Sequence, residues 1–244
     1  MSQPAKAVSA PFVSLRTFLG GLLPADREFL TTYRYLRRGI GIIGMLLPFV
    51  LPLGYAVSAR ILGIKGYPWP HSISAYYYTD MRNVFVGSMC AIGVFLICYR
   101  YSVWDDVLTN IAGALAVLVA LCPTSQSGAR PTFANDLHLV FATLLFVDFA
   151  AICLFLFTRS DQPRGARTRL KRIRDGIYIL CGTVILACII LAVAHTGVWL
   201  FWYEAVAIFA FGVSWLVKGE AIWVLNDDRG PAVRQGHRVL EPEA

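Results

Sequence analysis

The chain has 244 residues, of which 57% are hydrophobic and only 15% are charged. Soluble domains carry about a quarter charged residues, so this composition excludes an ordinary soluble globular protein and favours one embedded in a lipid bilayer. A net charge of +7 would also suit a nucleic-acid-binding protein, but the basic residues lie in the segments that flank apolar runs. We therefore predict the lipid bilayer as the partner and no nucleic acid.

Six apolar runs follow one another along the chain, each near the ~20 residues that cross ~30 Å of hydrocarbon as a helix. Backbone amides in lipid must be hydrogen-bonded within the segment, and the alternation typical of barrel strands is absent, so each run is predicted to be a helix. The predicted fold class is all-α, a polytopic transmembrane bundle with six spans. The predicted spans are Gly39–Ser58, Met81–Tyr99, Val107–Cys122, Leu137–Phe157, Ile177–Ala194 and Val198–Val217.

The flanking segments complete the predicted domain organisation. Residues 1–37 form an N-terminal segment, in which the mildly amphipathic stretch Pro11–Pro24 either lies on the membrane surface or belongs to a flexible tail. Residues 38–220 form the six-helix transmembrane domain, and residues 221–244 form a polar tail. No cleavable signal peptide is predicted, because the first thirty residues lack a basic start followed by an uninterrupted apolar core.

Lysine and arginine are unequally divided between the two sides of the predicted bundle. With six spans, 18 of the 22 basic residues fall on the side of both termini, and the other side holds only Arg60, Lys65, Arg82 and Arg130. The positive-inside rule then predicts cytoplasmic termini in a multi-pass protein of the plasma (inner) membrane. The basic run Arg164–Arg174 lies at the inner leaflet, either as a topogenic signal or as a binding site for anionic lipid.

The outward connectors gather polar residues at the ends of the predicted helices. Glu204 lies about six residues into the sixth helix, ~9 Å below the outer surface. A carboxylate in hydrocarbon costs about 2.5–3.5 kcal/mol on insertion scales and normally faces the bundle interior with a partner. A cation in the first turn of a helix opposes the macrodipole, so Arg82 is expected to pair with Asp80, Asp136 or Glu204.

These residues predict one polar pocket at the outer face that binds a lipid headgroup or a small amphiphile. The alternative is purely structural: the aromatic residues anchor the helices at the interface, while Thr79 or Asp80 caps the second helix and Asn135 or Asp136 the fourth. The predicted ligand-binding residues are His71, Ser74, Tyr77, Asp80, Arg82, Asp136, His138, His195 and Glu204.

Two other functions use ionisable residues of the same chain. A membrane-embedded enzyme that modifies lipids or isoprenoids would use the outer residues for acid–base or metal-assisted chemistry. Zinc is the metal that His71, His138 and His195 would suit, but no two histidines have helical i, i+3 or i, i+4 spacing, so no metal or other cofactor is predicted. A proton-coupled carrier would instead use Asp148, near the middle of the fourth helix, unless that residue only bonds Asn110.

Four stretches of the chain resemble a bacterial family of small multi-pass membrane proteins, the group described as domain of unknown function 998. The resemblance extends from about Arg38 to Glu220. It implies the six-helix membrane fold and carries no established activity. The stretches are "SISAYYYTDMRNVFVG" (Ser72–Gly87), "NIAGALAVLVALCPT" (Asn110–Thr124), "HLVFATLLF" (His138–Phe146) and "FGVSWLVKGE" (Phe211–Glu220).

Overall fold

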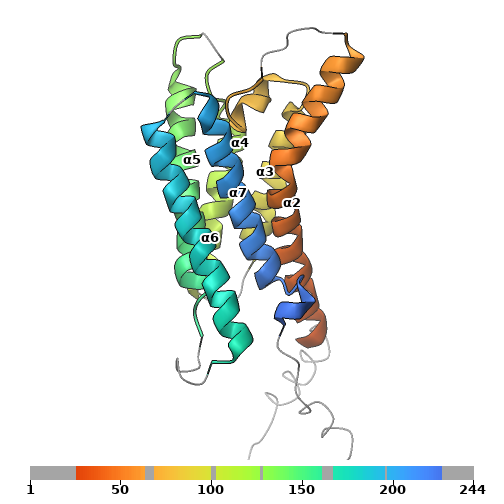
Figure 1. The fold of residues 1–244 in the computed structure, drawn as a ribbon, viewed down its shortest axis with the longest axis vertical. Helices are drawn as coiled ribbons and strands as arrows, with labels where there is room; N and C mark the ends of the chain where they lie inside the picture. Colours follow the sequence, from red (N-terminus) through yellow and green to blue (C-terminus); the bar gives the residue numbers. More distant parts are fainter. Residues whose placement is uncertain are drawn as a thin grey trace, which may run out of the picture.

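The computed structural model describes residues 26–63, 69–99, 103–126, 129–160, 167–195 and 197–226. Within these ranges the chain is all-helical, as predicted, with six antiparallel α-helices and no strand (Figure 1). The helices are α2 (Asp26–Ile61), α3 (Arg82–Ile97), α4 (Val103–Leu121), α5 (Phe133–Ala151), α6 (Arg169–Ala194) and α7 (Val198–Lys218). The described residues also form three short elements: the 3-10 helix η1 (Ser74–Tyr78) between α2 and α3, the π-helical turn η2 (Ile152–Leu156) directly after α5, and the 3-10 helix η4 (Trp223–Leu225) after α7.

The helices follow the predicted apolar runs, but two of them extend well into polar sequence. α2 has 36 residues and begins before the predicted Gly39, and α6 has 26 residues and begins before Ile177. By length and apolar composition, Thr32–Ile61, Phe133–Leu156, Arg169–Ala194 and Trp199–Lys218 are able to cross a membrane, while α3 is a shorter apolar helix. The predicted N-terminal segment up to Pro24 and the tail beyond Asn226 lie outside the described residues.

Large apolar side chains cover the outside of the bundle. Exposed fractions reach 66% for Leu53 on α2, 68% for Phe155 on η2, and 63% and 69% for Leu180 and Ile190 on α6. Soluble monomers rarely expose contiguous apolar patches larger than a few hundred Å², so an exterior of this kind is typical of a protein surrounded by lipid. The apolar exterior and the four long helices together indicate a membrane protein.

The two ends of the bundle differ in what they hold. The start of α2, the start of α6 and the end of α7 lie together at one end, which we call the basic end (Figure 1). The connector with η1 and the connector between α4 and α5 lie at the opposite end, which we call the loop end. In the middle of the bundle α7 lies between α2 and α6 and packs against both.

Threonine side chains accept backbone hydrogen bonds at two helix starts of the loop end, and one of them, Thr79, was among the suggested capping residues. Thr132 is the N-cap of α5, and its side chain accepts a hydrogen bond from Asn135 N at 3.3 Å, the kind of bond that satisfies an orphan amide at a helix start. Before α3, Thr79 Oγ1 accepts from Met81 N at 3.1 Å. Asp80 and Asp136 therefore do not cap α3 and α5 as was suggested for them.

Close approach of α2 and α7 depends on glycines in both helices. A Cβ atom on Gly212 would lie 2.6 Å from the backbone nitrogen of Met45 and 2.8 Å from the carbonyl oxygen of Gly41. A Cβ on Gly41 would meet the carbonyl oxygen of Gly212 at 2.9 Å. Small residues at such a crossing let two backbones touch, which is the packing mode that membrane helices favour.

We predict that Gly212→Ala lowers the unfolding free energy by about 1–3 kcal/mol. The new methyl group would overlap backbone atoms, which cannot move aside by a change of rotamer as a side chain can. Thermal unfolding of the purified protein in detergent measures the change. Gly176→Ala in α6 is the matched control, since no atom lies within 4 Å of a Cβ at that position. That control should keep or slightly raise the unfolding temperature, and an equal loss in both variants would contradict the close contact.

Candidate functional site

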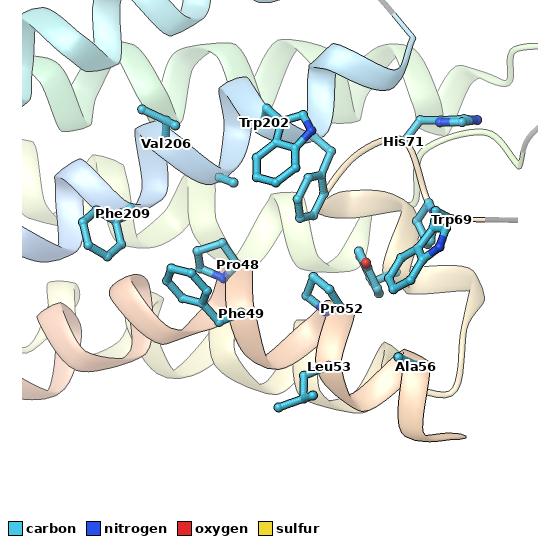
Figure 2. A pocket seen from close by; sticks show the side chains of 14 residues that line it. Pro48, Phe49, Pro52, Leu53, Ala56, Trp69, His71, Trp202, Val206 and Phe209 are labelled. Atoms are coloured by element: carbon cyan, nitrogen blue, oxygen red, sulfur yellow. The ribbon is translucent and has the colours of Figure 1, made fainter. Parts of the chain in front are cut away.

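A groove with a volume of about 1100 Å³ lies between α2 and α7 (Figure 2). Its floor includes the buried residues Pro48, Tyr76 and Ala205, while Leu53 and Trp202 on its rim are 66% and 60% exposed. The groove therefore opens sideways, among the apolar side chains of the exterior. Its lining consists of Pro48, Phe49, Pro52, Leu53, Ala56, Trp69, Pro70, His71, Tyr76, Phe201, Trp202, Ala205, Val206 and Phe209.

The groove exists because α2 and α7 separate beyond their glycine contact. Pro48 and Pro52 lie inside α2, and each removes a backbone donor and crowds the preceding turn, which bends a helix. Toward the loop end α2 diverges from α7 (Figure 1). The small side chains Ala56 and Ala205 line the widening gap and leave it unfilled.

The connector with η1 forms the wall of the groove at the loop end. Tyr76 on η1 is 1% exposed, and its ring packs at 5.8 Å from Tyr55 of α2 and at 6.3 Å from Phe201 of α7, measured between ring centroids. Burial, with a smaller contribution from Tyr55, raises the pKa of Tyr76 to about 12, so its phenol is neutral at physiological pH. Trp69 and His71 lie at this end of the groove (Figure 2).

Glu204 holds this connector to α7. Its Oε2 atom accepts a hydrogen bond from the backbone N–H of Ile73 at 2.5 Å, and the N–H of Ser74 also bonds the carboxylate. These amides open η1, where N–H groups have no partner within the helix. The predicted inward orientation of Glu204 toward a partner is thus present, and the partner is backbone rather than Arg82.

A second, much smaller cavity of about 40 Å³ lies next to this bond, inside the bundle. Ser74, His138 and Glu204 line it together with apolar residues of α3, α4, α5 and α7. Because a carbonyl only accepts, His138 Nδ1, at 2.6 Å from Cys122 O, carries a proton, and in the neutral ring Nε2 is the acceptor.

The other predicted residues of the outer face do not join this cavity. Asp80 accepts a hydrogen bond from Ser58 of α2. Arg82 donates to Tyr77 Oη at 2.5 Å and lies 4.1 Å from the centre of the same ring, so the expected pairing of Arg82 with an acid is wrong. Asp136 is exposed and accepts from the neighbouring Asn135 at 3.4 Å.

The three histidines of the zinc alternative lie in different surroundings. His71 is exposed at the groove, His138 is buried against α4, and His195 is exposed at the end of α6. Among the described residues, no group of three or more His, Cys, Asp or Glu side chains is arranged to hold a metal ion. The single outward pocket predicted from the sequence is therefore divided between an apolar groove, a small internal cavity and separate surface contacts.

Asp148 is buried in α5, one helical turn before the π-helical turn η2. One of its carboxylate oxygens, Oδ2, has no hydrogen-bond partner among the described residues. The side chain faces α4 at Ala112 rather than the suggested partner Asn110. The prediction of a role in proton transfer stays open, while the simple Asp148–Asn110 bond is not formed.

The basic end holds a polar network that the sequence reasoning counted only as topogenic charge. Arg37 donates to Tyr99 Oη at 2.5 Å and to the carbonyl oxygen of Lys218 at 3.3 Å. Arg38 donates to the carbonyl oxygens of Gly219 and Glu220 at 3.0 and 2.9 Å. Cations near a helix C-terminus stabilise its unpaired carbonyls, so these arginines of α2 cap α7. Adjacent arginines just before the predicted first span were the only sequence signal for this.

Part of the basic run Arg164–Arg174 is engaged within the protein. Arg167 and Lys171 both bond Asp175, at 3.0 and 2.5 Å. Arg169 and Arg172 are exposed at the start of α6. Residues 164–166 lie outside the described part of the chain, and an anionic-lipid site along this run stays a prediction.

Comparison of the chain with protein-family models, curated proteins and solved structures finds no match. The resemblance to the family of unknown function stays a prediction from the quoted stretches. The geometry of the groove and of the connector is then the basis for a functional proposal.

We predict that Glu204→Ala releases the connector, because it leaves the buried N–H groups of Ile73 and Ser74 without an acceptor at a cost of about 1–3 kcal/mol. Hydrogen exchange at these two amides should become faster, and Glu204→Gln, which keeps an acceptor oxygen, should have a smaller effect. Asp136→Ala removes an exposed carboxylate at the same end and serves as the control. Unchanged exchange in Glu204→Ala would contradict the role assigned to this bond.

Proposed function

We propose that the protein is a multi-pass membrane protein that binds the hydrophobic tail of a membrane amphiphile in the groove between α2 and α7. The volume of about 1100 Å³ and the almost wholly apolar lining carry this proposal. Ligand pockets are typically ~300–1,000 Å³ and mainly apolar, with a few polar groups that fix orientation. The proposal keeps the amphiphile predicted from the sequence but assigns recognition to its tail rather than to its headgroup.

Six spans and cytoplasmic termini form part of the proposal. Helices of 16 and 19 residues, the lengths of α3 and α4, are about 24 and 28 Å long at 1.5 Å per residue, close to the thickness of a bilayer core. The basic end becomes the cytoplasmic end by the positive-inside rule. It holds Arg34, Arg37, Arg38, Arg159, Arg167, Arg169, Lys171, Arg172, Arg174 and Lys218, against Arg60, Arg82 and Arg130 at the loop end. We propose the plasma (inner) membrane as its location.

The occupant we favour is one acyl or isoprenoid chain from the leaflet at the loop end. The groove lies in the half of the bundle that holds η1 and opens between exposed apolar residues, so in a bilayer its mouth meets lipid chains. Lipid gives no hydrophobic driving force for this binding. A concave wall with Phe49, Tyr76 and Phe209 instead offers a chain more van der Waals contact than a flat helix surface does.

A polar headgroup would lie at the loop end of the groove, beside Trp69 and His71. Both side chains are exposed, and a tryptophan at the membrane interface presents an apolar ring with a polar edge. Among the described residues that line the groove, His71 and Tyr76 are the only ionisable side chains, and none is a carboxylate. Acid–base chemistry needs a positioned acid and base, so the groove favours binding over the enzyme alternative.

We predict that Val206→Trp fills the groove and reduces the amount of amphiphile that stays bound during purification. Val206 is 46% exposed and lines the groove, so the larger side chain has room without distorting the core. Native mass spectrometry should record about tenfold less retained lipid, the ratio for ~1.4 kcal/mol of lost packing.

The matched control is Val140→Trp on α5, where the valine is 53% exposed and lies outside the groove. This variant should retain lipid like the parent protein. Equal lipid retention by Val206→Trp, Val140→Trp and the parent would contradict the proposal that the groove is the binding site.

A further inference from the structure

Four cations from three helices converge at the basic end around the last residue of α7. Arg37 comes from α2, Lys171 and Arg174 from α6, and Lys218 from α7. The guanidinium of Arg37 bonds the Lys218 carbonyl at 3.3 Å, and the Lys218 ammonium interacts electrostatically with Arg37, Lys171 and Arg174. Asp105 of α4 is the opposing charge that acts on the same ammonium.

Three of these cations have acceptors within the protein. Arg37 donates to Tyr99 Oη at 2.5 and 3.2 Å, Lys171 to Asp175 at 2.5 Å, and Arg174 to the carbonyl oxygen of Leu225 at 2.6 Å. The bonds of Arg37 and Arg174 connect α2 to Tyr99 and α6 to η4, and the bond of Lys171 lies within α6. These side chains therefore form a fixed basic surround rather than loose surface charge.

Lys218 differs from the other three. Its ammonium lies 5.2 Å from the centre of the Phe157 ring, and within the described residues it has no hydrogen-bond acceptor. A lysine at a helix end would ordinarily extend to the headgroup region, whereas this one is partly buried and folded back over an aromatic ring. An ammonium has three N–H donors, and a ring face replaces an acceptor oxygen only weakly.

A second donor without an acceptor lies beside the same ring. The Trp215 ring is 5.1 Å from Phe157, fully buried, and its Nε1–H has no partner among the described residues. Like charges in a partly buried setting repel one another much more than in water, so the surplus of cations and donors around Lys218 favours an anion. Asp105 and Asp175 balance only part of this charge.

We propose that Lys218 and the surrounding cations form a binding site for a phosphate group at the basic end, carried by a lipid headgroup or present as free phosphate. Lys218 supplies the direct charge-assisted hydrogen bond, since its donors are the uncommitted ones. Arg37, Lys171 and Arg174 add a positive electrostatic potential that attracts the anion. The site lies at the opposite end of the bundle from η1 and does not depend on the groove (Figure 1).

The unmodified full chain gives the first test. It is reconstituted in nanodiscs of phosphatidylcholine with added phosphatidylglycerol, and native mass spectrometry counts the lipids that stay bound. The site predicts one retained phosphatidylglycerol per chain. In a phosphatidylcholine nanodisc with inorganic phosphate in the buffer, a free-anion site predicts a higher unfolding temperature than with chloride.

Lys218→Met gives the second test, with Arg172→Met as its matched control. Both remove one positive charge from the same end, but Arg172 is exposed on α6 and lies outside the cluster. Loss of one charge-assisted hydrogen bond should weaken phosphate binding about tenfold in Lys218→Met and little in Arg172→Met. Lys218→Arg, which keeps the charge, should retain binding and covers the case in which Lys218→Met does not fold.

The outcomes separate the two sources and the failure of the site. Retention of phosphatidylglycerol without an effect of inorganic phosphate identifies a lipid headgroup, and an effect of inorganic phosphate identifies a free anion. Equal weakening by Lys218→Met and Arg172→Met would mean diffuse surface charge and overturn the proposal. So would an unmodified chain that neither retains phosphatidylglycerol nor responds to inorganic phosphate.

Discussion

The contact between the backbones of α2 and α7 is the constraint on which the rest of the arrangement depends. Gly41 and Gly212 bring the two helices together toward the basic end, and Pro48 and Pro52 then let α2 diverge. A pair of helices that touches at one end and separates at the other must either fill the gap or leave it open. Here the chain fills the loop end with η1 and leaves the groove below it.

Polar residues serve this arrangement at both ends. At the loop end, Glu204 binds the amides that open η1 and so fixes Tyr76 between α2 and α7. At the basic end, Arg37 and Arg38 of α2 bond the last carbonyls of α7. In both places an ionisable side chain bonds backbone N–H or C=O groups that have no partner within a helix. Lipid cannot solvate such groups, and they occur at helix ends, which is where these bonds lie.

The sequence was sufficient for the helices and for the inward orientation of Glu204, because run length and the cost of a buried carboxylate are local properties. It was insufficient for the site. Arg82 donates to Tyr77, five residues away, and of the three histidines only His138 lines the internal cavity. Neither contact follows from composition or spacing. The groove depends on the packing of side chains from three separate segments, so no sequence motif predicts it.

Photo-crosslinking with a lipid that carries a diazirine in its acyl chain tests the central claim most directly. After reconstitution and irradiation, peptide mapping locates the adducts. A groove that binds one chain predicts adducts concentrated on Phe49, Leu53 and Val206, above the level at Leu180 and Ile190, which are comparably exposed on α6. Adducts distributed equally over both sets of residues would contradict a binding groove between α2 and α7.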